Sequence, residues 1–328
     1  MKTEKIGNKV FPPNEPNKAK YCRCNAAKEN VCFKTGDSRS NQNPQLTIHQ
    51  IMFVREHNRL AKELKDINPH WDDERLFQEA RRINIAVFQH ITYYEWMPIL
   101  LNNTNLSNNQ IIFPDVQGFV NDYDSTKVPD VSNEHATAAF RQLMNGERQR
   151  QSSIPINDWL NRPQILENGI EQLTVGLVSQ PMEDSDNVFV KQITDNLFVC
   201  TSGIDFGKDL KAMDIQRDRD HALGYYNDYR KFCGLKTAQS WEDYGDYIKP
   251  KYIAKLKKLY KSYKDVDLSV GGGLETNIVE AEVGPTFLCI LNEQFRRTRQ
   301  ADRFWFENLS SRFTLGNQLI IKYLARHF

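Results

Sequence analysis

Apolar side chains recur at helical spacing in the stretch that follows Gln45. The positions on the shared face are Ile48, Ile51, Met52, Val54, Leu60, Ala61 and Leu64. This spacing predicts a helix from Gln45 to the residue before Asn68. Thr47 is the expected N-cap, because its hydroxyl can accept a hydrogen bond from the first turn. Asn68-Pro69 is expected to end the helix, because the residue before a proline disfavours the helical backbone conformation.

A second amphipathic stretch predicts a helix from about Glu74 to Tyr94. Its apolar face is formed by Leu76, Ala80, Ile83, Ala86, Val87 and Ile91. Asp72 or Asp73 is the expected cap. Pro98 is expected to end the helix, because proline has no backbone N–H group to donate.

A third helix is expected to open at Ser132 and to include residues 136–141, after which the composition turns polar as in a surface turn. Further helices are predicted near residues 164–180, 220–232, 250–263, 284–299 and 314–326. Strand-like alternation is scarce, so the predicted fold class is mainly α. Residues 1–45 are polar and rich in proline, and they are interpreted as a loop-rich segment. We therefore expect a single domain, with this segment leading into a helical part over residues 46–328.

The composition of the 328-residue chain is that of an ordinary globular protein, with 40% hydrophobic and 26% charged residues. A net charge of +1 gives no electrostatic attraction toward nucleic acid or a membrane surface. No apolar run approaches the ~20 residues that cross a bilayer, so no membrane span is predicted. Residues 1–7 lack the apolar core of a secretory signal, which taken alone indicates the cytosol.

The cysteines favour a different compartment. Cys22 and Cys32 flank a short loop of small and polar residues, a spacing that suits a local disulfide. Asn102, Asn105 and Asn308 each begin an Asn-X-Ser/Thr sequence, which can be glycosylated in a secreted protein. The alternative is that all six cysteines are small buried hydrophobic residues. The residues alone leave both interpretations open.

Several segments, in order, resemble sequences of one known family. They are Gly36-Asp-Ser-Arg39, residues 46–59, residues 68–76, residues 89–98, Ile215-Gln-Arg-Asp-Arg-Asp-His221 with the following residues to Leu235, Val283-Gly-Pro-Thr-Phe287 and residues 293–308. From about residue 20 to 325 the chain resembles the animal haem peroxidases, and within them the arthropod chorion and peroxinectin types. The resemblance implies a helical domain that binds haem b.

The resemblance assigns roles to five residues. Arg39 matches the distal arginine, whose permanent charge can stabilise charge that develops as the peroxide bond breaks. Gln42 stands where the family usually has a glutamate that forms an ester with a haem methyl, and an amide cannot form that bond. Asn227 matches the asparagine that orients the proximal histidine. Arg141 and Arg230 match arginines near the haem propionates. The alternative for these two is ordinary charge on a helix surface.

The resemblance also implies disulfides between Cys22 and Cys32 and between Cys233 and Cys289. Cys24 and Cys200 have no counterpart that the resemblance identifies.

The proximal histidine of the family should follow Phe140-Arg141, but none is there. Counting strictly, Met144 takes its position, and a methionine thioether can ligate haem iron. The simpler interpretation is a short deletion that removed the histidine. The other histidines (49, 57, 70, 90, 135, 221 and 327) do not replace it. No Asp-His-Asp motif, which carries the family's distal histidine, occurs in the chain. The family's calcium-binding loop is expected to lie outside the chain, and Asp122-Tyr-Asp124 is interpreted as a solvated turn.

The resemblance implies an enzyme that reduces hydrogen peroxide while oxidising a halide, a phenol or tyrosine. The first hypothesis is that this chain is a fragment or isoform of such an enzyme with impaired haem binding. The alternative is a non-catalytic pseudoperoxidase with a role in adhesion or in the extracellular matrix. The family resemblance implies secretion. The expected partners are hydrogen peroxide and a small reducing substrate, with an extracellular matrix or cell-surface protein in the alternative.

Overall fold

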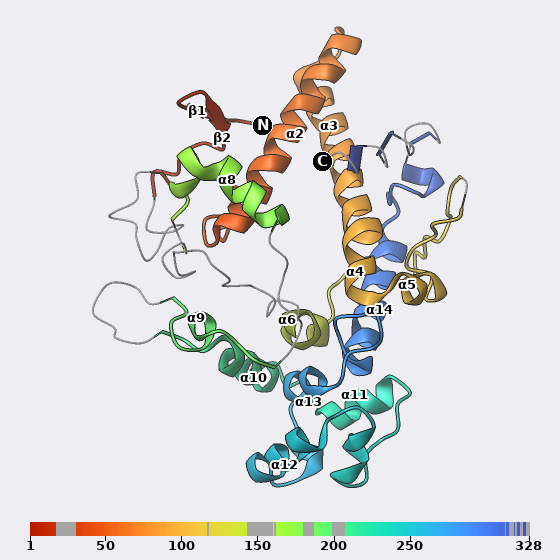
Figure 1. Ribbon diagram of the computed structural model, residues 1–328. Helices are drawn as coiled ribbons and strands as arrows, with labels where there is room; N and C mark the ends of the chain where they lie inside the picture. Colours follow the sequence, from red (N-terminus) through yellow and green to blue (C-terminus); the bar gives the residue numbers. More distant parts are fainter. Residues whose placement is uncertain are drawn as a thin grey trace. The chain divides into compact units, whose positions relative to one another are not determined.

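The structure is a computed structural model (Figure 1) that describes part of the chain. The described residues are 1–17, 31–116, 118–142, 160, 162–179, 187–198, 207–311, 313–314, 318, 320–321 and 324–325. They fall into two compact units. The first unit comprises Met1–Ile85, Arg148–Glu183 and Phe189–Leu210, and the second comprises Ala86–Glu147, Asp184–Val188 and Lys211–Phe328. The single domain over residues 46–328 stays a prediction, and each unit is described here by itself.

Helices make up most of the described chain, which confirms the predicted fold class. The first unit contains β1 (Glu4–Ile6), β2 (Lys9–Phe11), α2 (Pro44–Ile67), α8 (Ile165–Ser179), α9 (Lys191–Thr194) and the beginning of α3 (Asp73–His90). The second unit contains the end of α3, η1 (Ile91–Trp96), α4 (Met97–Leu101), α5 (Asn103–Asn108), η2 (His135–Ala139), α6 (Phe140–Gln142), α10 (Leu210–Asp220), α11 (Tyr226–Phe232), η4 (Glu242–Asp246), α12 (Pro250–Leu259), η5 (Tyr263–Asp265), α13 (Leu268–Leu274), α14 (Pro285–Ala301) and η6 (Leu309–Ser311). No helix in the described part of the chain is long and apolar enough to cross a membrane.

The segment interpreted as loop, residues 1–45, contains a β-hairpin, so that part of the prediction is wrong. Strands β1 and β2 pair antiparallel, with Glu4 opposite Phe11. Gly7 in the turn has a φ of 61°, a left-handed conformation that glycine adopts without a steric penalty. Phe11 is buried and stacks on Phe33, with ring centroids 5.4 Å apart. Such short strands are missed because tertiary packing stabilises them more than their own sequence does.

Helix α2 begins three residues before its predicted cap. Asn43 is the N-cap, and its side-chain oxygen accepts a hydrogen bond from the Gln45 amide at 2.8 Å. Pro44 follows at the first helical position, where the missing N–H group needs no partner. Thr47 lies inside the helix, and its hydroxyl donates to the Ser40 carbonyl at 2.6 Å. The predicted cap at Thr47 is therefore wrong. Ile48 and Ile51 of α2 pack with Leu166 and Ile170 of α8 in the core of this unit.

Pro98 does not end the helical segment that begins with α3. The chain continues as the π-helix η1 and then as α4, in which Pro98 occupies the second position. A proline in the first turn of a helix is tolerated, because that N–H group has no partner within the helix. The prediction that the helix stops at Pro98 is therefore wrong.

The other predicted helices are mostly confirmed. Those near residues 164–180, 250–263 and 284–299 are α8, α12 and α14. The third helix opens at Ser132 as predicted, and the Ser132 hydroxyl accepts a hydrogen bond from the His135 amide at 3.4 Å. In place of one helix near 220–232, α10 ends at Asp220 and α11 begins at Tyr226. Ala222 between them has a φ of 52°, which a right-handed helix cannot contain. The turn predicted after Gln142, and most of residues 314–326, lie outside the described residues.

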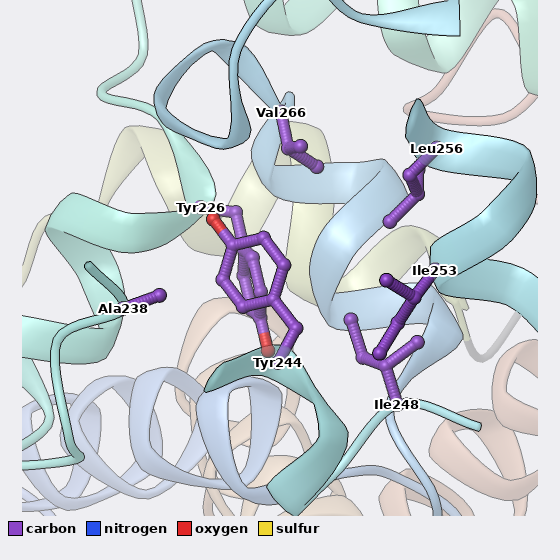
Figure 2. Close-up of a cluster of buried hydrophobic side chains, with 7 residues drawn as sticks. All are labelled: Tyr226, Ala238, Tyr244, Ile248, Ile253, Leu256 and Val266. Carbon is purple, nitrogen blue, oxygen red and sulfur yellow. The ribbon is translucent and has the colours of Figure 1, made fainter. Parts of the chain in front are cut away.

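One hydrophobic cluster of the second unit lies between α11, η4, α12 and α13. Figure 2 shows its buried side chains, which are Tyr226, Ala238, Tyr244, Ile248, Ile253, Leu256 and Val266. The rings of Tyr226 and Tyr244 are tilted against each other, with centroids 5.1 Å apart. Helix α13 packs closely on its neighbours because of two glycines. A Cβ atom at Gly271 would lie 2.1 Å from the Tyr226 ring, and one at Gly272 would lie 2.4 Å from the Phe287 ring.

Replacing Gly271 is expected to destabilise the second unit. Gly271→Ala forces a methyl group into the Tyr226 ring, so the free energy of unfolding should fall by about 1–3 kcal/mol. The matched control is Gly176→Ala in α8, where no atom lies within 4 Å of the new Cβ. That substitution should raise stability by about 0.5–1 kcal/mol, because alanine favours the helix. Urea unfolding measures both changes, and equal effects of the two variants would contradict the close contact.

Candidate functional site

Arg39 lies in the first unit and is bound to Asp37. The Arg39 guanidinium donates two hydrogen bonds to the Asp37 carboxylate, at 2.9 Å and 2.6 Å. The side chain of Arg39 is 74% exposed. The bond to Arg39 lowers the pKa of Asp37 to about 2. Gln42 follows in the same turn, and its backbone N–H group donates a hydrogen bond to the Arg39 carbonyl at 2.9 Å. The positive charge predicted to act on peroxide is therefore paired with a carboxylate of its own motif.

Arg141 lies in the second unit near a cluster of buried charges on α10. Its Nε donates to the Ala136 carbonyl at 2.9 Å. Burial raises the pKa of Asp214, and the positive charges of Lys211, Arg217 and Arg141 oppose that rise. Arg217 binds the Asp214 carboxylate at 2.6 Å. The charge of Arg141 therefore helps to keep the pKa of Asp214 from rising further.

The same cluster includes Asp218, whose carboxylate accepts a hydrogen bond from the Ser269 amide of α13 at 2.8 Å. Burial raises the pKa of Asp218 and lowers that of Lys211. Sequence reasoning missed this cluster. The sequence signal for the cluster is the spacing of Lys211, Asp214 and Asp218, which places three charged residues on one helix face. Such a face is usually exposed to solvent, so the spacing alone does not predict burial.

Asn227 on α11 fixes the loop that follows the helix. Its side-chain nitrogen donates to the Ala238 carbonyl at 3.0 Å, and its side-chain oxygen accepts from the Ala238 amide at 2.9 Å. Both ends of the amide therefore pair with one backbone residue. The predicted role of Asn227, to orient a haem-ligating histidine, stays a prediction.

Arg230, one turn further along α11, is fully buried. Its guanidinium donates to the Lys236 carbonyl at 2.9 Å and 2.7 Å, to the Tyr226 hydroxyl at 3.1 Å and to both carboxylate oxygens of Asp246, the nearer of which it contacts closely. An arginine has five N–H groups, and these five bonds use all of them. As the guanidinium lies here, no N–H group is left for a haem propionate. The interpretation of Arg230 as surface charge is wrong, because the side chain is buried in an ion pair.

Helix α13 connects the elements that carry the site residues of the second unit. It packs against η2 and α6, which lead to Arg141, and against α11, which carries Asn227 and Arg230. A Cβ atom at Gly273 would lie 3.0 Å from the side-chain oxygen of Gln142. Three predicted cofactor residues, Arg141, Asn227 and Arg230, therefore lie on helices that pack against α13. Arg39 and Gln42 belong to the other unit, and Met144 lies outside the described residues.

His135 is a buried histidine of η2 beside this group. It is 8% exposed and lies against the rings of Phe140 and Phe295, at centroid distances of 5.1 Å and 5.6 Å. Its Nδ1 has no hydrogen-bond partner among the described residues. Burial lowers the pKa of His135 to about 4. The imidazole is therefore neutral at physiological pH.

The burial of His135 predicts a pH dependence of stability. Between about pH 6.5 and 4 the unfolded chain binds a proton at this position and the folded chain does not. The free energy of unfolding is expected to fall by up to about 3 kcal/mol as the pH drops through this window. In His135→Phe that loss should be absent, because phenylalanine does not titrate. The exposed His49→Phe is the control. A wild-type loss that persists in His135→Phe would contradict this assignment, and urea unfolding at several pH values measures it.

A disulfide joins Cys233, at the end of α11, to Cys289 of α14. Their Cα atoms are 5.9 Å apart, within the range of native disulfides. This is the pairing that the resemblance implied. Cys32 is also disulfide-bonded, and its predicted partner Cys22 lies outside the described residues, as do Cys24 and Cys200. The alternative of reduced, buried cysteines is wrong for Cys32, Cys233 and Cys289.

The structure also shows the surroundings of two other sequence features. Asn308 is 1% exposed, and its side chain donates to the Asp302 carbonyl at 3.2 Å, so this Asn-X-Ser sequence is not accessible to glycosylation in the folded chain. The turn with Asp122 and Asp124 does not gather its carboxylates on one ion site. Asp122 binds Arg299 at 2.7 Å, and Asp124 accepts from the Thr126 hydroxyl at 2.6 Å.

Comparison with known proteins identifies the family. A model described as "Animal haem peroxidase" matches residues 1–321. The chain belongs to the animal haem peroxidase family, whose cofactor the description names. It is 51% identical over 291 residues to Peroxidase of Drosophila melanogaster, a match that covers 85% of this chain and 42% of the relative. It is 38% identical over 289 residues to Chorion peroxidase of the same organism, covering 84% of this chain and 35% of the relative.

Solved structures share the fold. Peroxidase A from Dictyostelium discoideum superposes with a TM-score of 0.80 at 31% identity, covering 100% of this chain and 62% of that structure. A fatty acid alpha-dioxygenase from Oryza sativa superposes with a TM-score of 0.72 at 20% identity, covering 97% of this chain and 58% of that structure, and shows likeness of fold alone. The chain spans less than half the length of the curated relatives above.

Proposed function

We propose that this chain is part of a haem peroxidase. Such an enzyme reduces hydrogen peroxide while it oxidises a halide, a phenol or tyrosine. We propose in addition that the 328 residues on their own bind haem weakly. The observation that carries the first part is the family match over residues 1–321. Catalysis would also need an axial ligand, a distal base and free guanidinium groups.

The contacts of the site residues support the second part. The Arg230 guanidinium has all of its N–H groups bound within the chain, and the Asn227 amide is bound to Ala238 at both ends. The Arg230 guanidinium, as it lies here, does not fit a haem propionate, and the Asn227 side-chain oxygen already accepts one hydrogen bond from the Ala238 amide. Gln42 has no carboxylate with which to form an ester. The sequence places no histidine after Phe140-Arg141.

A hemin titration tests this proposal. The purified chain is expected to give no sharp Soret band of a histidine-ligated haem, because no imidazole occupies the position of the axial ligand. The matched variant is His135→Phe, which removes the buried histidine nearest to Arg141 in sequence. A sharp Soret band in the wild type would contradict weak binding. Its loss in His135→Phe would then identify His135 as the ligand.

A second candidate function is a pseudoperoxidase that keeps the fold for adhesion. It is favoured by Arg39 and Arg230, whose charges are paired with Asp37 and Asp246. The disulfides are typical of an oxidising compartment such as the extracellular space, where an extracellular matrix or cell-surface protein would be the partner. Attachment of cells to surfaces coated with the haem-free chain would support this function, and attachment only to the haem-loaded form would exclude it.

A further inference from the structure

Lysines are concentrated on one segment of the second unit. Seven of the chain's 43 lysines and arginines lie between residues 249 and 264, and no aspartate or glutamate lies among them. We call these residues the α12 lysine surface: Lys249, Lys251, Lys255, Lys257, Lys258, Lys261 and Lys264. All seven are exposed. The net charge of the whole chain is only +1, so the rest of the chain is net acidic and the positive charge is local.

The packing of α12 explains why these lysines face outward. Ile253 and Leu256 of α12 are buried in the core cluster of Figure 2. Lys251, Lys255 and Lys258 are spaced at i, i+4 and i+7, so they share one face of the helix. That row extends for about 10 Å along the helix axis. Lys261 and Lys264 continue the surface beyond the end of α12.

Little of this charge is neutralised within the described residues. Lys257 binds Glu242 at 2.5 Å, and this is the surface's one ion pair in the described part of the chain. Lys251 and Lys255 lie near the Tyr252 ring, at 4.7 Å and 6.0 Å from its centroid. A tyrosine ring attracts a cation without cancelling its charge. The surface therefore presents a row of positive charges to solvent.

The chemistry of the surface selects among anionic partners. The charged side chains of this surface are all lysines, and a lysine is a compact point charge without the planar fork by which arginine binds phosphate in a bidentate way. Ile253 and Leu256 of α12 are buried, and Leu259 is the one large hydrophobic residue of this helix that is exposed, which is too little to insert into a bilayer. The disulfides of the chain are typical of an extracellular compartment. Short clusters of basic residues are typical of heparin-binding and nucleic-acid-binding sites, which attract their polyanions by charge.

We propose that the α12 lysine surface binds a sulfated polysaccharide. The polysaccharide lies along the row of Lys251, Lys255 and Lys258, and its sulfate groups pair with the ammonium groups. Binding releases counterions from the polyanion, so it weakens as salt concentration rises. The interaction does not require haem and does not depend on the peroxidase reaction.

The test measures binding of the 328-residue chain to a fluorescent heparin oligosaccharide at about 0.15 M salt, the physiological ionic strength. In the variant with Lys251→Gln, Lys255→Gln and Lys258→Gln, we expect Kd to rise about tenfold or more. The slope of log Kd against log salt concentration should decrease by about two to three. Replacing the same three lysines by arginine should keep the affinity, because the charge is retained.

The matched control replaces three exposed lysines of the first unit, Lys2→Gln, Lys5→Gln and Lys62→Gln. It changes the net charge by the same amount, and its Kd should stay within about twofold of the wild type. A loss of affinity in the control equal to that in the α12 variant would overturn the proposal, because net charge alone would then explain binding. An unchanged Kd in the α12 variant would overturn it as well.

Two further arms distinguish the class of partner. Desulfated heparin is expected to bind at least about tenfold more weakly than heparin, because fewer charges meet the lysines. Vesicles containing phosphatidylserine, and single-stranded DNA, are expected to bind more weakly than heparin. Tighter binding to either of these, or equal binding to desulfated heparin, would overturn the assignment to a sulfated polysaccharide.

Discussion

The purified 328-residue chain, supplied with hemin and hydrogen peroxide, is expected to oxidise guaiacol no faster than free hemin. Without an axial imidazole the iron is held poorly and its redox potential is not tuned. Without a distal base, proton transfer from peroxide loses a contribution of roughly 10²–10⁴-fold. The charge of Arg39 cannot offset both losses, because it is already paired with Asp37.

Three rates test this expectation. Initial rates are compared for the chain with hemin, for hemin alone and for the variant Arg39→Gln with hemin, and all three rates should agree. A wild-type rate well above that of hemin, lost in Arg39→Gln, would contradict the prediction. It would show that Arg39 acts on peroxide and that Met144 or one of the histidines serves the iron.

Asp246→Ala is expected to lower the free energy of unfolding by about 3–5 kcal/mol. Among the described residues, Asp246 is the one carboxylate bound to the Arg230 guanidinium, and the Arg230 side chain is fully buried. An uncompensated buried charge is strongly destabilising, because the protein interior does not solvate it as water does.

The control for Asp246→Ala lies on the same short helix, η4. Glu242→Ala breaks the exposed ion pair with Lys257 and should cost less than about 1 kcal/mol. Chemical unfolding of both variants measures the difference. Equal effects would show that Arg230 is not held by Asp246, and would leave it available for the propionate that the resemblance assigns to it.

The sequence by itself determined the elements whose signal is local. The amphipathic period of α2, α8, α12 and α14 predicts these helices, because a helix buries one face whatever its neighbours are. The order of motifs predicted the family and the Cys233–Cys289 disulfide. The ends of helices were less certain, since Asn43 and Thr47 can both cap and only the observed backbone distinguishes them. Helices α10 and α13 had no periodic apolar signal. One carries buried charges and the other three glycines, and both are stabilised by their neighbours.

The tertiary structure alone decided what most of the site residues contact. Asp37 lies two residues before Arg39 in the same motif. The partners of Asn227 and Arg230, which are Ala238 and Asp246, follow from loops that fold back onto α11. The burial of His135 and the exposure of all seven lysines of the α12 lysine surface depend in the same way on which helix face the core covers. A side chain's residue type fixes its possible chemistry. Its hydration, its charge partners and so its actual role are set by long-range packing, which local sequence patterns do not encode.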